Sequence, residues 1–338
     1  MPITHFKKLS QPKKSPVYDT YWRFANKRNQ VFMNRITDPD GPWTDDIVIS
    51  KHRFTNVFRA SDRVSQFLID LQYRDDNKAD IFFKTMLFKI FNKIDTYKFL
   101  EREIGALTAA DFNFKEYDQL LSWRMTEGNT IYSAAYIMPS AGNVFGYKSK
   151  HSNHLALLSQ MLKDNFHERI QAAKSLAEIY QLFLSCPSFG TFLAFQYTID
   201  INYSSLVNFS EMDFVVAGPG AINGINKCFD TLGDFNYADI IRLMADEQEK
   251  ECQRLEIEVP KLWGRKLHLI DCQNLFCEVD KYLRGTHPEL SGASGRTRIK
   301  QIYSANHAPL QFFFPPKWNI NNNINKLWQK AATEDIFL

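Results

Sequence analysis

The sequence has little glycine and proline, the two residues that most often make tight turns. It contains 14 Gly and 13 Pro among 338 residues, too few for the closely spaced turns of an all-β sandwich or barrel. It also has no run of about 18 uncharged apolar residues, and its N-terminus lacks the apolar core of a secretion signal. These absences predict a mostly α-helical, cytoplasmic protein.

Cysteine is also scarce, and its spacing does not fit a metal site. The five cysteines are an odd number, lie mostly in apolar runs and show no closely paired spacing typical of zinc or iron–sulfur ligands. We therefore expect buried free thiols, no metal and no cofactor. The five are Cys186, Cys228, Cys252, Cys272 and Cys277.

What the chain does have is apolar area and a basic N-terminal region. Hydrophobic residues make up 44% of it and aromatics 14%, enough for a sizeable core. No repeat or Gly/Ser linker divides it, so we expect an arm over residues 1–16 and one monomeric helical domain over 17–338. Residues 1–35 hold eight Lys or Arg against one acid, Asp19. Such an arm suits a polyanion such as DNA, and a solvated tail has the same composition.

Apolar periodicity predicts most of the helices. Residues 132–149 fit a short strand or an irregular loop, and the charged stretch 237–256 fits a solvated helix. The expected helical stretches are 17–36, a long helix from Lys51 to Leu71, 80–100, 117–125, two within 151–184, 190–203, 237–256 and 267–285.

Residues 212–229 predict a helix, a tight hairpin and a second helix. An apolar helix would end at Gly218, Pro219 would block its continuation, and Gly220 would allow a positive φ before a helix starting near Asn223. Unpaired backbone N–H groups at such a turn, with the helix dipole, form an anion site for DNA phosphate. The predicted DNA contacts are Gly218, Gly220, Ile222, Asn223 and, one turn later, Lys227. An ordinary connection between two helices has the same pattern.

The stretch AGPGAINGI resembles the hairpin of helix-hairpin-helix DNA glycosylases. In that superfamily a catalytic aspartate follows at the start of another helix, and the resemblance assigns this role to Asp271, where a carboxylate would stabilise the developing sugar cation and orient water. Asn274 and Glu278 share the polar face of that helix and would assist. No lysine stands at the family's Schiff-base position, near Gly224, so the resemblance implies a monofunctional enzyme. The alternative is that Asp271 only caps its helix.

Two further groups of residues suit DNA or a modified base. Arg59 and Arg63 are four residues apart, so on one helix they would share a face that contacts phosphate. Trp43 and Asn56 lie nearby in sequence and are assigned to the base pocket. A buried Arg–Asp network involving Asp62 would explain the arginines equally.

The second group follows the face of the helix expected over 190–203. A base flipped from the duplex needs an aromatic partner and hydrogen bonds to its edge. We predict that Gln196, Tyr197, Asp200 and Tyr203 provide them. Core packing is the alternative.

Taken in order, W-R-F-A, P-W-T-D-D, R-F-T-N-V-F-R, F-Q-Y, G-P-G-A and L-I-D-C-Q-N-L-F-C-E-V-D-K-Y resemble the alpha-glutamyl/putrescinyl-thymine pyrophosphorylase family, over roughly residues 20–285. The helical domain of that family also accompanies hydroxymethyluracil DNA kinases, and some similar proteins are anti-phage glycosylases. The resemblance therefore implies a helix-hairpin-helix DNA glycosylase that flips a bulky modified base, α-glucosylated hydroxymethylcytosine, out of phage DNA and hydrolyses its N-glycosidic bond, leaving an abasic site.

Two alternatives stay open. One is a pyrophosphorylase or transferase that makes hypermodified pyrimidines in DNA, and the other is a non-catalytic DNA-binding module that accompanies a modification kinase. The sequence has no glycine-rich phosphate loop with its Lys-Ser/Thr pair, which disfavours a nucleotide kinase within this chain.

Overall fold

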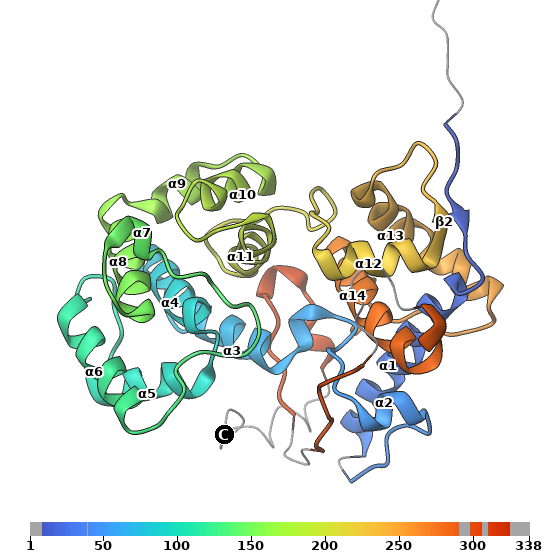
Figure 1. The fold of residues 1–338 in the computed structure, drawn as a ribbon, viewed down its shortest axis with the longest axis horizontal. Helices are drawn as coiled ribbons and strands as arrows, with labels where there is room; N and C mark the ends of the chain where they lie inside the picture. Colours follow the sequence, from blue (N-terminus) through green and yellow to red (C-terminus); the bar gives the residue numbers. More distant parts are fainter. Residues whose placement is uncertain (1–8, 39, 291–297, 306–309, 325–338) are drawn as a thin grey trace, which may run out of the picture. The chain divides into compact units, whose positions relative to one another are not determined.

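A computed structural model describes residues 9–38, 40–290, 298–305 and 310–324 (Figure 1). These residues form fourteen α-helices and one sheet of two short strands, which confirms the expected mostly α-helical fold. The chain makes two compact units: unit 1 comprises residues 1–59 and 215–310, and unit 2 comprises 60–214 and 311–338. One domain over 17–338 stays a prediction. None of the helices in the described ranges combines the length and apolar character that a membrane span requires.

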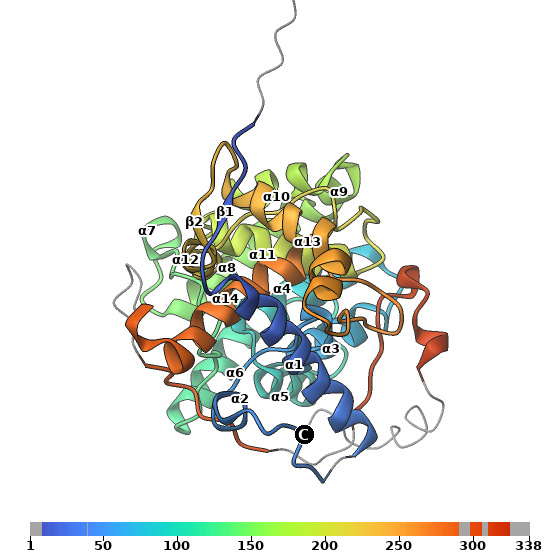
Figure 2. The same ribbon diagram turned by 90° about the vertical axis from the view of Figure 1, so that its right-hand side faces the viewer.

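Unit 1 is built around α14, which packs against α1, α12 and α13 (Figures 1 and 2). Its elements are β1 (Lys13–Lys14), α1 (Tyr18–Thr37), α2 (Ile47–Lys51), α12 (Pro219–Cys228), β2 (Phe229–Thr231), α13 (Tyr237–Arg254), α14 (Leu269–Thr286) and the 3-10 turn η2 (Pro288–Leu290). Aromatic side chains of α1 and α14 form much of its core, with the ring of Tyr21 4.6 Å from that of Phe276.

Unit 2 is a helical array whose central members are α4 and α11. Its elements are α3 (Arg63–Gln72), α4 (Lys78–Phe91), α5 (Ile94–Ile104), α6 (Phe114–Thr126), α7 (Gly142–Phe145), α8 (Lys150–Lys163), α9 (Phe166–Ala172), α10 (Leu176–Leu184), α11 (Thr191–Tyr203), η3 (Pro316–Trp318) and η4 (Asn321–Asn323). Every described residue of α11 from Leu193 to Tyr203 is buried. The 3-10 turn η1 (Arg59–Ser61) lies where the chain passes between the units.

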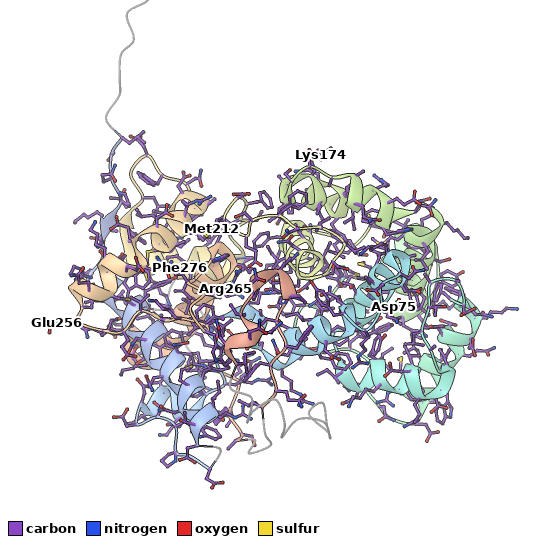
Figure 3. All side chains as sticks on the ribbon, turned by 180° about the vertical axis from the view of Figure 1, so that it is seen from behind. Asp75, Lys174, Met212, Glu256, Arg265 and Phe276 are labelled. Carbon is purple, nitrogen blue, oxygen red and sulfur yellow. The ribbon has the colours of Figure 1, made fainter. Side chains whose placement is uncertain are left out.

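Two glycines allow a close contact between α12 and α14 in unit 1. A Cβ built on Gly224 would lie 2.1 Å from the backbone oxygen of Phe276, and one on Gly220 would lie 2.9 Å from the Cys277 sulfur. Because these glycines are four residues apart on α12, they present one bare strip to α14. The side chain of Phe276, on α14, is fully buried in unit 1 (Figure 3).

The continuous helix expected from Lys51 to Leu71 is wrong. Helix α2 ends at Lys51, residues 52–58 form no helix, and α3 begins at Arg63. The backbone of this stretch forms hydrogen bonds with a distant segment instead. The N–H of Arg53 donates to the backbone oxygen of Gln301, and the N–H of Tyr303 donates to the backbone oxygen of Lys51. Apolar spacing alone did not reveal these long-range bonds.

Other boundaries differ less. The stretch 80–100 is two helices, because Asn92 adopts a left-handed conformation (φ 49°) and ends α4. Residues 151–184 contain three helices rather than two, and 132–149 are irregular apart from the short α7. The predicted helix over 237–256 is confirmed as α13, but it is only partly solvated, since Met244, Gln248 and Glu251 are buried.

The described part of the N-terminal arm pairs with unit 1. Lys13 and Lys14 form β1, which pairs antiparallel with β2. Lys13 lies 3.2 Å from Asp230 and Lys14 lies 2.7 Å from the buried Glu251. These two lysines are therefore paired with acids of unit 1, while Lys7 and Lys8 lie outside the described residues.

Candidate functional site

Two of the segments singled out in the sequence meet in unit 1. Residues 54–59 run along the polar face of α14, more than two hundred positions away in sequence. The backbone N–H of Arg59 donates to Asp271 Oδ1 (2.9 Å), and that of Thr55 donates to Glu278 Oε2 (3.0 Å). The carboxylates of α14 thus hold this non-helical segment in place by satisfying backbone donors that have no helical partner.

Asp271 is engaged at both oxygens. Its Oδ2 accepts a hydrogen bond from the backbone N–H of His268 (3.1 Å), and its side chain is almost buried. It occupies the third position of α14, with His268 as the N-cap, so it sits one turn inside the cap position expected for it. A carboxylate that accepts two backbone N–H groups near a helix N-terminus acts first as a structural anchor.

His268 beside it is held neutral. Its Nδ1 lies 2.9 Å from the Arg265 guanidinium, which can only donate. Burial, with a smaller contribution from the positive charge of Arg265, lowers the pKa of His268 to about 4. The start of α14 therefore offers no titratable imidazole near neutral pH.

Glu278 is also paired within its own helix. Lys281 Nζ lies 2.7 Å from Glu278 Oε2 in an i,i+3 ion pair and 4.7 Å from the centroid of the Phe54 ring. Asn274 lies one turn before Glu278 on the same helix and is half-buried. Nearby, Arg28 donates to the side-chain oxygen of Asn56. A catalytic role for Asp271, Asn274 or Glu278 stays a prediction.

Replacing Asp271 with asparagine tests the anchor. The asparagine side chain keeps one acceptor oxygen but loses the second acceptor and the negative charge at the helix N-terminus, so we expect D271N to lower the free energy of unfolding by about 1 kcal/mol. Urea unfolding followed by circular dichroism measures it. N274D, which alters the same face without touching these bonds, is the control, and an unchanged midpoint for D271N would contradict the anchor.

The predicted hairpin is wrong. Residues 214–218 are not helical, and α12 begins at Pro219 with Gly218 as its N-cap. Gly220 lies inside the helix and is not among the positive-φ glycines. The physical reason is that proline is favoured in the first turn of a helix, where its missing N–H costs nothing, so Gly-Pro-Gly starts a helix here instead of turning a chain.

Of the phosphate contacts predicted around that hairpin, Lys227 has another partner in unit 1. Its Nζ lies 2.9 Å from Asp280 Oδ1, and both side chains are buried. A contact with phosphate would first have to break this pair. Gly218, Gly220, Ile222 and Asn223 all lie at the first two turns of α12 or its cap, and their role in DNA binding stays a prediction.

The arginines do not share a helix face. Arg59 lies in η1 and is buried, whereas Arg63 is exposed and begins α3. They are separated by Asp62, the N-cap of α3. Trp43 is buried as well: its indole N–H donates to the backbone oxygen of Asp38 (2.6 Å), so it closes the loop after α1 rather than lining an open pocket.

The four residues predicted to hold a flipped base lie together on α11, as expected from their spacing, but inside unit 2. Gln196, Tyr197, Asp200 and Tyr203 are each at most 1% exposed. Asp200 has a charged neighbour that was not predicted, Lys89 on α4, whose Nζ lies 3.1 Å from Asp200 Oδ2. The available signal was the lysine within the apolar stretch MLFKIF at the end of α4.

A second feature missed from the sequence is a basic ribbon in unit 1, which we define as Lys51, Arg53, Arg298 and Lys300. Residue 52 forms an antiparallel bridge with residue 302, which brings the segments 51–53 and 298–303 together. All four basic side chains are exposed, and neither 47–56 nor 298–305 contains an acid. Such a ribbon presents positive charge that no neighbour in sequence cancels.

Comparison with known proteins identifies relatives. Residues 15–292 match the family model described as 5-hmdU DNA kinase, helical domain. The 5-hmdU DNA kinase of Bacillus phage SP10 is 24% identical over 288 residues, which cover 79% of this chain and 45% of the relative. This chain thus spans about half the length of the curated relative it matches. No solved structure matches it significantly.

These matches correct the predicted enzyme class. The family and the phage relative are named as DNA kinases, which are transferases, so the assignment as a monofunctional DNA glycosylase is wrong. The broader expectation of a helical protein linked to modified pyrimidines in DNA is supported. The error arose because a short glycine-proline stretch was given the function of a motif whose geometry it does not adopt.

Proposed function

Since this chain belongs to the family of the helical domain of 5-hmdU DNA kinases, we propose that it recognises DNA containing a modified pyrimidine. The observation that carries the proposal is the family match over residues 15–292, which extends through both units. More than half of the phage relative lies outside the region of similarity. We assign recognition of the DNA to this chain, and phosphoryl transfer to a separate catalytic part of such systems.

The basic ribbon supports contact with the DNA backbone. Lysine and arginine neutralise phosphates and release counterions, which makes binding favourable and salt-dependent. Two segments joined by backbone hydrogen bonds hold these side chains on a defined scaffold, whereas a flexible tail would not. Phosphate contacts position a protein on DNA without reading its sequence, so discrimination must come from contacts with the base.

Binding of matched duplexes tests the proposal. We expect the purified chain to bind a duplex carrying one 5-hydroxymethyluracil at least several-fold more tightly than the same duplex carrying thymine, measured by fluorescence anisotropy over a salt series. Equal affinity for both duplexes, or no binding to either, would overturn the proposed function.

Substitutions in the basic ribbon provide a second test of DNA binding. K51Q/R53Q should weaken binding to both duplexes by about tenfold and lower the slope of log K against log salt by about 2, because each lost phosphate contact removes about one unit. The charge-matched control is K163Q/K174Q in unit 2, where both lysines are exposed (Lys174 is labelled in Figure 3). If the control weakens binding as much, net charge rather than the ribbon is responsible.

A further inference from the structure

Unit 2 contains an ion pair that is withdrawn from water. Lys89 Nζ lies 3.1 Å from Asp200 Oδ2 and 2.9 Å from Asn92 Oδ1, and the side chains of Lys89 and Asp200 are 3% and 1% exposed. Burying both charges costs several kcal/mol of hydration, which their attraction does not reliably repay. Replacing a buried ion pair with well-packed hydrophobic residues is often neutral or stabilising, so stability alone does not explain this pair.

A partly buried aromatic ring lies beside this pair. The centroid of the Tyr136 ring lies 4.8 Å from Lys89 Nζ, and Tyr136 is only partly buried. The same ring is stacked on that of Phe192, at the start of α11, with centroids 5.8 Å apart and planes within 3°. Tyr136 therefore lies flat against one aromatic ring, with a cation near its face.

The backbone of Tyr136 is strained. Its φ is +54°, a left-handed conformation that is an outlier for a bulky residue and is energetically unfavourable. It belongs to an irregular segment before α7, in which Ile137 is 61% exposed. Displacing Tyr136 would relieve this backbone strain, which favours its leaving this position.

A second tyrosine, Tyr197, also lies near Lys89. Lys89 Nζ lies 5.9 Å from the centroid of the Tyr197 ring, and the Tyr197 hydroxyl is buried with no hydrogen-bond partner among the described residues. A buried polar group left without a partner is destabilising, because it has lost its hydrogen bonds to water. A ligand that reached this position would satisfy it.

We infer that the Tyr136 ring occupies the place of a pyrimidine base, and that Lys89, Asp200, Tyr197 and Phe192 form a site that binds a pyrimidine extruded from DNA. The inference rests on the proposed function and names the part of the chain that reads the base. The stacked ring, the cation beside it and the unpartnered hydroxyl together define the site.

The chemistry of the site fits a uracil-type edge. Such an edge offers carbonyl oxygens on either side of an N–H. The ammonium of Lys89 donates to a carbonyl, the carboxylate of Asp200 accepts from the N–H, and Phe192 stacks on the ring. Purines are larger than the phenol ring that they would replace. Tyr136 competes with the ligand, so the affinity of the wild-type protein is reduced by the small fraction in which the ring has left.

Binding of a free nucleoside tests the site without requiring DNA. Y136G removes the ring and adopts the positive φ without strain, so it is expected to fold. By isothermal titration calorimetry, Y136G should bind 5-hydroxymethyl-2′-deoxyuridine at least tenfold more tightly than wild type, and 2′-deoxyadenosine no better than wild type does. Y136F, which keeps the stacked ring, should behave as wild type.

A second variant tests the role of Lys89. Y136G/K89M should lose the increased affinity of Y136G for the nucleoside, because the ammonium that donates to the carbonyl of the base is gone. Circular dichroism establishes that the double variant is folded. If it does not fold, Y136G/Y197F, which removes only the unpartnered hydroxyl, should lose part of the gain. Failure of Y136G to bind the nucleoside better than wild type overturns the inference. The duplex experiment tests the proposed function separately. If the wild-type chain prefers the modified duplex but Y136G binds the nucleoside no better than wild type does, the proposed function stands and the base is recognised at another site.

Discussion

Substituting alanine for Gly224 is expected to lower the free energy of unfolding by about 3 kcal/mol. The new Cβ would lie 2.1 Å from the backbone oxygen of Phe276 and 2.7 Å from its carbonyl carbon. Backbone atoms of a helix cannot rotate aside, so α12 and α14 must move apart and lose packing along their contact. The better helix propensity of alanine returns only about 1 kcal/mol. Urea unfolding followed by circular dichroism measures the loss.

Gly220 provides a matched control on the same strip. The Cβ of G220A would meet the Cys277 sulfur at 2.9 Å, and this atom belongs to a side chain. We expect a loss of about 1 kcal/mol, recovered when Cys277 is also changed to alanine, whereas C277A cannot rescue G224A. A G224A protein as stable as wild type would show that the helices do not approach as closely as described. Burial raises the pKa of Cys277 to about 12, so C277A removes a neutral thiol and not a charged thiolate.

The second large effect is expected at Asp280, the shared acid of a buried charge cluster in unit 1. Asp280 pairs with both Lys227 and Arg284, and its side chain is 2% exposed. D280A would leave two cations largely out of water with no counter-charge, so we expect a loss of about 3–5 kcal/mol. The thermal unfolding midpoint and urea titration should both fall accordingly.

K227M separates the loss of charge balance from the loss of a contact. Methionine fills similar space, and Asp280 keeps Arg284, so we expect a change of under about 1.5 kcal/mol. The double variant D280A/K227M should be more stable than D280A, because one unpaired cation has been removed. If D280A alone is mild, the cluster is better hydrated than its burial indicates.

The sequence predicted those elements whose apolar residues repeat with a helical period. Helices α1, α13 and α14 each place a continuous apolar stripe on one face, and their bounds were expected to within a few residues. The start of α12 was misread because glycine and proline serve both turns and helix beginnings. Only the packing of Gly224 on Phe276 shows which use applies, and that contact joins residues far apart in sequence.

The sequence predicted which helix face the candidate residues share, but not the groups that surround them. Asp271 and Glu278 do share the polar face of α14, yet the backbone donors that occupy them come from residues 55 and 59, which local periodicity cannot place. Lys89 was missed for a related reason. A single lysine in an apolar run is usually read as an interruption, and its partner Asp200 belongs to another helix. The basic ribbon exists only once the segments near residues 52 and 302 have paired.

The pairing of β1 with β2 and of α1 with α14 bears on the order in which the molecule is made. Residues 13–37 leave the ribosome well before α12 and α14, the helices beyond residue 218 that pack on α1. Until α12 and α14 have been made, the apolar face of α1 lacks its contacts with them, and closing so long a loop slows folding. A newly made α1 is therefore a candidate for chaperone binding, and a fragment ending before α14 would leave α1 without its contacts to that helix.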